Sequence, residues 1–454
     1  MLIRSYSSLS NFYKVTRKQS VRLSKGFSVT VSALEKILRT FIAGSGKQLV
    51  FEKPLESNPH FNDPAGLYLH IPLCHNYCSF CPYLKERYTD GLGLLLFEAI
   101  KREIHIFSEK CSLTNITSLY VGGGSPLVLG LMLSELVDLF RSKLHFDGDV
   151  AIEVHPNDIT GKGVEVIQRC NASMISLGVQ SFDDRVLKSI GRQYGATVAK
   201  SALSVLYKTG FDSLNVDLLF AIDGQDWESV KTDLQNARDL GATQITCYPL
   251  FTFPYTEIGR YLNLKKVKLP PFSVRKNIYY KIHEWCLRNG YVRTSVWSFT
   301  LSGNKPFSSV TRERFAGFGP SAGSYNGRQF YFNTFDITAY AEKSDQGYLP
   351  VALTMDVPVE LQRLFWVYWR FYETSIDTDT YRHKFGGDFF KDFKIQLIIL
   401  TWLKWIEKES GSHLRLTARG SHWLHLLQNF VALNYTSKLW EQMKQCAWPS
   451  RIDL

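Results

Sequence analysis

The chain has 454 residues, of which 45% are hydrophobic and 21% are charged, and its formal net charge is +11. This balance is typical of a globular chain and excludes a disordered or fibrous one. No apolar run approaches the roughly 18 to 20 residues of a membrane span, and no secretory signal is evident, so we expect a cytoplasmic protein. The positive charge favours nucleic acid, an anionic membrane surface or anionic substrates, and it equally suits a plain solvated surface.

Residues 1–60 are predicted to form a basic N-terminal extension. Arginine and lysine are scattered among serines in this segment, and acids are scarce. The same composition fits a mitochondrial-type presequence or a contact with a membrane surface. We interpret it as an extension of the main fold.

Apolar strand patterns alternate with helical patterns from Gly66 onward. The predicted strands are residues 66–71, 117–122, 149–154, 173–179, 213–219 and 243–249, and the predicted helices are residues 91–108, 132–144, 158–170, 183–208 and 226–240. Repeated strand–helix units predict parallel strands with right-handed crossovers. The expected fold is α/β, a partial (β/α)6 barrel over residues 61–345.

The remaining chain has a different pattern. Residues 273–299 predict a helix and then a strand that ends at Trp297, and residues 413–417 predict a small hairpin. Residues 346–454 are aromatic and helical in pattern, which predicts a mainly helical C-terminal domain. Its aromatic side chains are expected to form core, because buried aromatic rings contribute much of the buried area of a core.

Residues suited to chemistry follow the predicted strands. Chemistry in β/α folds occurs at the carboxyl ends of the strands. The residues found at these ends are Cys74, Gly122, Glu153, Gln180, Asp217 and Tyr248. Their shared position predicts one site at this edge of the sheet.

Three cysteines, Cys74, Cys78 and Cys81, have CxxxCxxC spacing directly after the first strand. Ferredoxin clusters use four cysteine ligands, so three thiolates predict a [4Fe–4S] cluster with one iron open to a small molecule. Zinc is the alternative metal, but structural zinc takes four protein ligands and His75 is too close to Cys74 to be the fourth. The other five cysteines are single and scattered, which suits a reducing compartment.

The segment Gly122–Pro126 has the sequence GGGSP. Glycines allow close approach of the backbone to a ligand, and successive N–H groups can form an anion-binding nest. A plain tight turn explains the same residues equally well. Glu153 suits an amine or ribose hydroxyls, and Arg192 suits a carboxylate.

These segments, in this order, resemble the radical S-adenosylmethionine (SAM) superfamily, in the branch of oxygen-independent coproporphyrinogen III oxidase. The resemblance covers residues 64–345. Besides the motifs above, the matching segments are 68–74, 178–181, 191–192, 215–218 and 317–319. It implies a [4Fe–4S] cluster on Cys74, Cys78 and Cys81, with SAM chelating the open iron. The residues implied to line the SAM pocket are Tyr68, Gly123, Gly124, Ser125, Glu153, Gln180, Arg192 and Asp217.

The resemblance also implies the chemistry. A reduced cluster, supplied by a flavodoxin- or ferredoxin-type electron donor, cleaves SAM to methionine and a 5′-deoxyadenosyl radical that abstracts hydrogen. The protein then has to orient the reactants and exclude water.

Three features of the sequence indicate which member of this branch the chain is similar to. Tyr83 stands where the oxidases have a further cysteine, and residues 331–340 lack the histidine of the related haem chaperones. Residues 244–250, 294–299 and 308–312 look like the class C radical methyltransferases that act on haem or menaquinone.

The resulting expectation is methylation of an sp² carbon of a tetrapyrrole or quinone, using two SAM molecules. Trp297, Arg312 and Tyr248 are expected near the second SAM or the acceptor. The alternatives are an oxidase-like enzyme of porphyrin biosynthesis and a haem chaperone. We expect a small-molecule substrate, no nucleic acid, and a peripheral contact at the inner membrane face.

Overall fold

The computed structural model describes residues 49–54, 65–111, 113, 115–263, 268–308 and 313–454. Residues 49–454 form one compact unit. Residues 1–48 and 55–60 of the predicted N-terminal extension lie outside the described residues, and so does Arg312. In the described part of the chain, no helix is both long and apolar enough to cross a bilayer.

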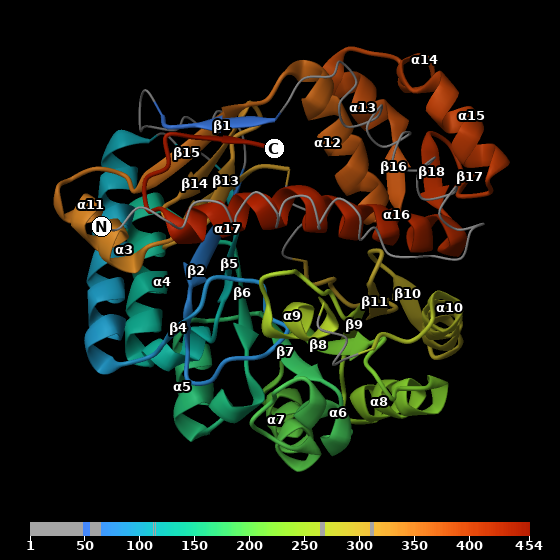
Figure 1. The fold of residues 1–454 in the computed structure, drawn as a ribbon, viewed down its shortest axis with the longest axis horizontal. Helices are drawn as coiled ribbons and strands as arrows, with labels where there is room; N and C mark the ends of the chain where they lie inside the picture. The colour runs from blue at the N-terminus through green and yellow to red at the C-terminus, as the bar shows by residue number, and fades with distance from the viewer. Residues whose placement is uncertain (1–48, 55–64, 112, 114, 264–267, 309–312) are drawn as a thin grey trace, which may run out of the picture. The chain divides into compact units, whose positions relative to one another are not determined.

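Six parallel strands form the centre of the sheet, and they confirm the six predicted strands. In spatial order they are β9 (Gln244–Pro249), β8 (Ser213–Phe220), β7 (Met174–Gln180), β6 (Asp149–Val154), β5 (Ile116–Gly123) and β2 (Ala65–Ile71). Both faces of β2 are buried, which explains its nearly continuous apolar sequence. Figure 1 shows these strands in the middle of the molecule.

The crossover helices follow the predicted pattern. They are α3 (Asp90–Lys110), α4 (Leu131–Leu144), α5 (Gly161–Arg169), α6 (Asp184–Ser189), α7 (Ala196–Thr209) and α8 (Trp227–Asp239). The helix predicted over 183–208 is divided because Gly191 has φ +77°, a left-handed conformation that ends α6. The helix predicted to begin at residue 158 starts later, because the Thr160 side chain caps α5 by accepting from the Gly163 N–H.

The sheet continues with antiparallel strands at both ends, to a total of 14 strands. Beyond β2 lie β12 (Phe315–Phe318), still parallel, and then β13 (Gly323–Tyr325), β14 (Gln329–Asn333), β15 (Val351–Asp356), β1 (Val50–Glu52) and β19 (Arg451–Asp453). Beyond β9 lie β11 (Ser298–Leu301) and β10 (Tyr291–Arg293). Within the described residues, no pairing joins the two ends, so the sheet is open, as a partial barrel requires.

The predicted strand ending at Trp297 is wrong in its bounds. The helix α10 (Phe272–Arg288) is present, but β10 ends at Arg293 and Trp297 lies in the turn before β11. This turn forms because the Ser295 hydroxyl accepts hydrogen bonds from the N–H groups of Trp297 and Ser298.

The C-terminal region is mainly helical, as predicted. Its helices are α12 (Val359–Tyr372), α13 (Thr378–Phe385), α14 (Phe389–Asp392), α15 (Lys394–Trp402), α16 (Ala418–Val431) and α17 (Ser437–Gln445), with the π-helical turn η3 (Ala432–Thr436) between the last two. The predicted hairpin strand is β18 (His413–Leu416), which lies between β16 (Ser375–Asp377) and β17 (Ile406–Lys408). Because β15 and β19 join the large sheet, this region is physically continuous with it. The division at residue 345 stays a prediction.

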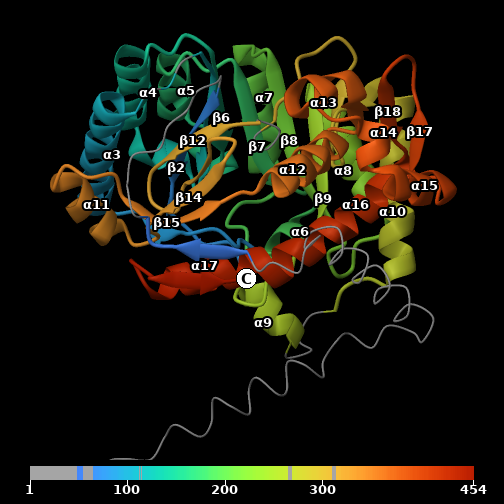
Figure 2. The same cartoon turned by 90° about the horizontal axis from the view of Figure 1, so that it is seen from above.

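The remaining short elements connect these layers. They are β3 (Leu73–Cys74), β4 (Glu86–Arg87), α9 (Glu257–Asn263), α11 (Ile337–Asp345) and the 3-10 turns η1 (Pro126–Leu129) and η2 (Pro156–Asp158). Figure 2 shows α3, α4, α5 and α7 along one side of the sheet and α16 and α17 across the other.

A buried carboxyl group joins the first crossover helix to the sheet extension. Glu103 of α3 accepts hydrogen bonds from the Gly319 N–H (2.8 Å), the Asn333 amide (2.7 Å) and the Tyr340 hydroxyl. Burial raises the pKa of Glu103 to about 7, although these three donors oppose the rise. The folded protein therefore holds this proton more tightly than the unfolded chain does.

This linkage predicts the pH dependence of stability. A carboxyl whose folded pKa is raised stabilises the fold below its unfolded pKa, near 4.5, and this contribution is lost as the pH rises through about 7. Glu103→Gln removes the titration and keeps one acceptor oxygen. We expect the free energy of unfolding of the wild type to fall by on the order of 2 kcal/mol relative to the variant between pH 5 and pH 8.

The measurement is urea unfolding at both pH values. Glu98→Gln, at an exposed ion pair on the same helix, is the matched control and should keep the wild-type pH dependence. An unchanged pH dependence in Glu103→Gln would contradict the assignment.

Candidate radical SAM site

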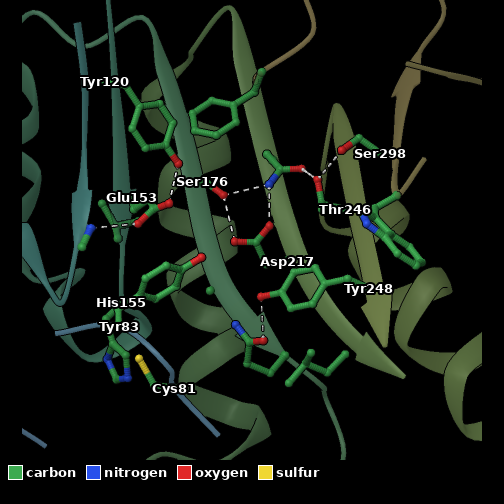
Figure 3. Close-up of a pocket in the computed structure, with 18 of the residues that line it drawn as sticks. Cys81, Tyr83, Tyr120, Glu153, His155, Ser176, Asp217, Thr246, Tyr248 and Ser298 are labelled. Carbon is green, nitrogen blue, oxygen red and sulfur yellow. Dashed lines mark hydrogen bonds between the residues drawn. The ribbon is translucent and has the colours of Figure 1, made fainter. Parts of the chain in front are cut away.

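A single cavity of about 1610 Å³ lies at the carboxyl ends of the parallel strands. It brings together nearly all of the residues predicted for the site. These are Cys74, Cys78, Cys81, Gly123, Gly124, Ser125, Glu153, Gln180, Arg192 and Asp217, together with Tyr248 and Trp297. Figure 3 shows the part of the cavity in which side chains from several neighbouring strands point toward one another.

The three cysteines lie on the loop that leaves β2 and are free thiols. The Cys81 N–H donates to the Cys78 carbonyl (3.3 Å), and the Lys85 ammonium donates to the carbonyls of Cys78 (2.9 Å) and Cys81 (3.2 Å). The loop is therefore held by its own backbone, and a cation lies beside the sulfurs.

The chemistry of these thiols fits a metal cluster. Burial raises the pKa of Cys74 to about 12 and also raises that of Cys81. A bound metal supplies the positive charge that favours the thiolate. Within the residues that the structure describes, no group of three or more His, Cys, Asp or Glu side chains has the spacing of a single-ion site.

The glycine segment packs directly against the cysteine loop. The N–H groups of Gly124 and Ser125 donate to the carbonyls of Ile71 and Leu73 (both 2.8 Å), and the Gly123 N–H donates to Glu153 (3.2 Å). Protein acceptors thus already occupy these donors, which favours the tight turn over an anion-binding nest, the two alternatives left open by the sequence. A Cβ atom at Gly124 would lie 2.5 Å from the Leu73 carbonyl oxygen and 2.8 Å from the Cys74 sulfur.

Ser125 and Glu153 are both engaged by partners. The Ser125 hydroxyl donates to Asp158, which follows β6 on η2. Glu153 accepts from the Tyr120 hydroxyl as well as from Gly123. Burial raises the pKa of Glu153, and these two donors only partly oppose the rise.

Asp217 is the acceptor end of a polar network that spans three strands. It accepts from the Ser176 hydroxyl (3.0 Å) and the Asn215 amide (2.8 Å), while the Asn215 carbonyl accepts from Thr246 (2.8 Å). Burial, and then the nearby charge of Glu153, raise the pKa of Asp217 to about 7. Such a carboxyl can hold or release a proton near neutral pH.

Gln180 and Arg192 lie at the end of β7 and after α6. Gln180 has φ +69°, a conformation uncommon for a residue with a side chain, and its amide oxygen accepts from the Tyr248 hydroxyl (3.3 Å). Arg192 donates to the Gly178 carbonyl (3.2 Å) and lies over the ring of Phe80, while its buried Nε has no protein partner. Both side chains thus remain available to a ligand in the cavity.

Tyr68 differs from the other predicted pocket residues, because it is not part of the cavity lining. Its hydroxyl lies 2.5 Å from Nδ1 of His70, and its ring lies 6.0 Å from that of Tyr120. Its role in the pocket stays a prediction.

The sequence interpretation missed several residues of the cavity. Asn215 and Ser176 were detectable, since both precede predicted site positions on the same strand face. Tyr120 was detectable in the same way, since it precedes Gly122 by two residues on β5, whereas Asp158 carries no such pattern. Most of the far wall was also missed: Trp297 was expected there, but Arg293, Trp369, Tyr372, Arg415 and Trp440 come from elements far apart in the sequence.

The far wall is rigidly supported. Arg293 is buried and donates to the Ser421 hydroxyl (2.6 Å) and the Leu416 carbonyl. Trp297 donates from its ring N–H to Gln428 (3.2 Å) and lies 4.2 Å from the ring of His425. Arg415 is more exposed and pairs with Glu409 (3.4 Å).

Comparison with known proteins agrees with this geometry. The family model of the radical SAM superfamily matches residues 68–237. The heme chaperone HemW of Lactococcus lactis subsp. lactis is 27% identical over 268 residues, which are 58% of this chain and 70% of that protein. The anaerobilin synthase of Escherichia coli O157:H7 is 24% identical over 298 residues, 64% of this chain and 67% of that protein.

A solved structure has the same fold. Coproporphyrinogen III oxidase (HemN) from Escherichia coli, described as a radical SAM enzyme, aligns with a TM-score of 0.70 at 20% identity, over 85% of this chain and 95% of that one.

The site and the family match support a radical SAM protein, whose cofactors are a [4Fe–4S] cluster and S-adenosylmethionine. Within that superfamily, the relatives support the branch that contains HemW and HemN. The expected class C methyltransferase pattern finds no support in these relatives, which have the names of haem chaperones, an anaerobilin synthase and a coproporphyrinogen oxidase.

The close approach of Gly124 predicts the effect of adding one methyl group. Gly124→Ala forces the Leu73 carbonyl or the Cys74 sulfur to move, and overpacking of this kind costs about 1–3 kcal/mol. We expect less iron bound per chain after anaerobic reconstitution with iron and sulfide, together with a lower unfolding temperature.

Gly161→Ala is the matched control, because a Cβ atom there meets nothing within 4 Å. Its iron content should equal that of the wild type. Full iron content in Gly124→Ala would show that the cysteine loop does not depend on this contact.

Proposed function

We propose that the protein is a radical SAM enzyme that acts on a tetrapyrrole held in the cavity beside the cluster. The observation that carries this proposal is the size and two-sided lining of the cavity. Pockets for one small molecule have volumes of about 300–1,000 Å³, so a cavity of about 1610 Å³ has room for SAM and for a second large ligand.

The two sides of the cavity suit different ligands. The cysteine side offers Glu153, Gln180, Arg192 and Asp217, which match the amine, carboxylate and hydroxyl groups of SAM. The far side offers the aromatic side chains of Trp297, Trp369, Tyr372 and Trp440, with Arg293 and Arg415. Aromatic faces suit a flat conjugated ring, and guanidinium groups suit its carboxylate arms.

The relatives favour a tetrapyrrole over a quinone. Their names refer to haem, to anaerobilin and to coproporphyrinogen III, and all three are tetrapyrroles. An oxidase-like reaction or haem carriage is therefore better supported than the methyl transfer expected from residues 244–250 and 294–299. Haem carriage is the second candidate, because HemW proteins recur among the relatives.

The cluster, when bound, supplies the electron that cleaves SAM to a carbon radical. The chain's own residues hold the ligands and keep water out. Burial raises the pKa of both Glu153 and Asp217, and that of Asp217 reaches about 7, so Asp217 can share a proton with an amine or hydroxyl of the bound SAM near neutral pH. The aromatic wall covers the opposite side, which protects a reactive radical from solvent.

The decisive experiment uses the full chain, reconstituted anaerobically with iron and sulfide, reduced chemically, and supplied with SAM and either haem or coproporphyrinogen III. We expect 5′-deoxyadenosine to form, with a change in the mass of the tetrapyrrole. Release of carbon dioxide identifies the oxidase, and a mass gain of one methyl group identifies methyl transfer.

Cysteine variants distinguish an enzyme from a carrier. Cys81→Ala should reduce 5′-deoxyadenosine formation by more than about 100-fold, since even the loss of a residue that only supports a ligand costs 10–100-fold. Cys446→Ala, at an exposed cysteine outside the cavity, should leave it unchanged. Stoichiometric haem binding that persists in Cys81→Ala without any product indicates the carrier, and a chain that neither binds nor changes a tetrapyrrole refutes the proposal.

The electron donor and the location are proposed alongside the reaction. A flavodoxin- or ferredoxin-type donor, a cytoplasmic location and a peripheral contact at the inner membrane face all stay predictions from the sequence. Reduction of the cluster by a purified flavodoxin tests the first of them.

A further inference from the structure

Tyr83 lies two residues after Cys81, and contacts with two different elements fix its position. Its backbone N–H stabilises the thiolate form of Cys81. The Lys444 ammonium of α17 donates to the carbonyl oxygen of Pro82 (2.9 Å) and lies 3.5 Å from that of Tyr83. The ring of Tyr83 lies 5.5 Å from that of Trp440, so the cysteine loop and α17 together fix its position.

The hydroxyl of Tyr83 points into the large cavity. Figure 3 shows it directed toward the side on which Glu153 and Asp217 lie. Half of the residue's surface is accessible, because the ring borders an open cavity. Within the part of the chain that the structure describes, the hydroxyl makes no hydrogen bond to another residue, unlike those of Tyr120 and Tyr248.

The charges around this hydroxyl limit what can lie beside it. Glu153 and Asp217, two buried acids of the cavity, lie on the side toward which this hydroxyl points. Two carboxylic acids nearby disfavour an anionic group of a ligand at this point. An uncharged hydrocarbon edge of a ring is compatible, because it packs against an aromatic side chain without an unpaired charge.

We propose that Tyr83 determines substrate specificity by contacting the uncharged edge of the tetrapyrrole, so that the carboxylate arms point toward Arg293 and Arg415. This inference rests on the proposed function. The aromatic ring makes the principal contact, since it lies between the polar cofactor side and the aromatic wall formed with Trp440.

The test is a titration of the reconstituted full chain with haem, followed by absorbance, for the variants Tyr83→Phe and Tyr83→Ala. Tyr83→Phe keeps the aromatic ring, so we expect it to bind haem within about twofold of the wild type. Loss of the ring should weaken it by more than about tenfold in Tyr83→Ala. Arg415→Gln should weaken haem binding and have no effect on a porphyrin that lacks carboxylate arms, whereas Tyr83→Ala should weaken both.

A second readout separates substrate contact from a structural role. In both variants we expect iron content and the rate of SAM cleavage without a tetrapyrrole to equal those of the wild type. Tyr77→Ala is the matched control, because Tyr77 lies on the same loop with a similar exposed fraction and does not line the large cavity.

The outcomes are distinguishable. A wild-type chain that binds no tetrapyrrole refutes the proposed function, and with it this inference. Haem binding by Tyr83→Ala within twofold of the wild type refutes the inference alone. Loss of iron or of SAM cleavage in Tyr83→Phe also refutes it, because that result would place Tyr83 on the cofactor side.

Discussion

The contact between the glycine segment and the cysteine loop is the constraint on which the site depends. Gly124 approaches Leu73 and Cys74 more closely than any residue with a side chain could. Its N–H and that of Ser125 extend the pairing of the β5 end with the β2 end into the loop. The first cysteine is thereby fixed relative to two strands, and the other two follow within the same short loop.

Several features near this contact reduce the free energy of unfolding, as is common at functional sites. Gln180 adopts a left-handed backbone conformation, which costs about 1–3 kcal/mol in a residue with a side chain. Glu153 and Asp217 are buried carboxylic acids with raised pKa values. The network of Ser176, Asn215 and Thr246 offsets part of that cost and keeps Asp217 in place before any ligand arrives.

The sequence was sufficient for the parts of the molecule that repeat a local pattern. The central strands are apolar runs with a residue suited to chemistry at or near the carboxyl end, so the six strands and this edge of the sheet could be predicted from the sequence alone. The cysteine spacing similarly indicated a cluster. Tyr68 was assigned by resemblance, and in the structure its hydroxyl faces His70.

Most of the far wall could not be predicted in this way. Arg293, Trp369 and Trp440 belong to three different elements and meet only because α12, β10 and α17 converge in the folded chain. No sequence period links them. The N–H groups of the GGGSP segment illustrate a related limit, since a pattern shows that donors are present but not which acceptors reach them first.

The two sides of the cavity are synthesised at different times. The cysteine loop and the six central parallel strands precede residue 250, whereas Gln428 and Trp440 of the opposite wall leave the ribosome much later. A nascent chain can therefore fold the thiol-bearing edge while the cavity is still open on one side. Iron and sulfide have a wide entrance during that interval, and the enclosure that a radical requires is completed only after α16 and α17 have folded.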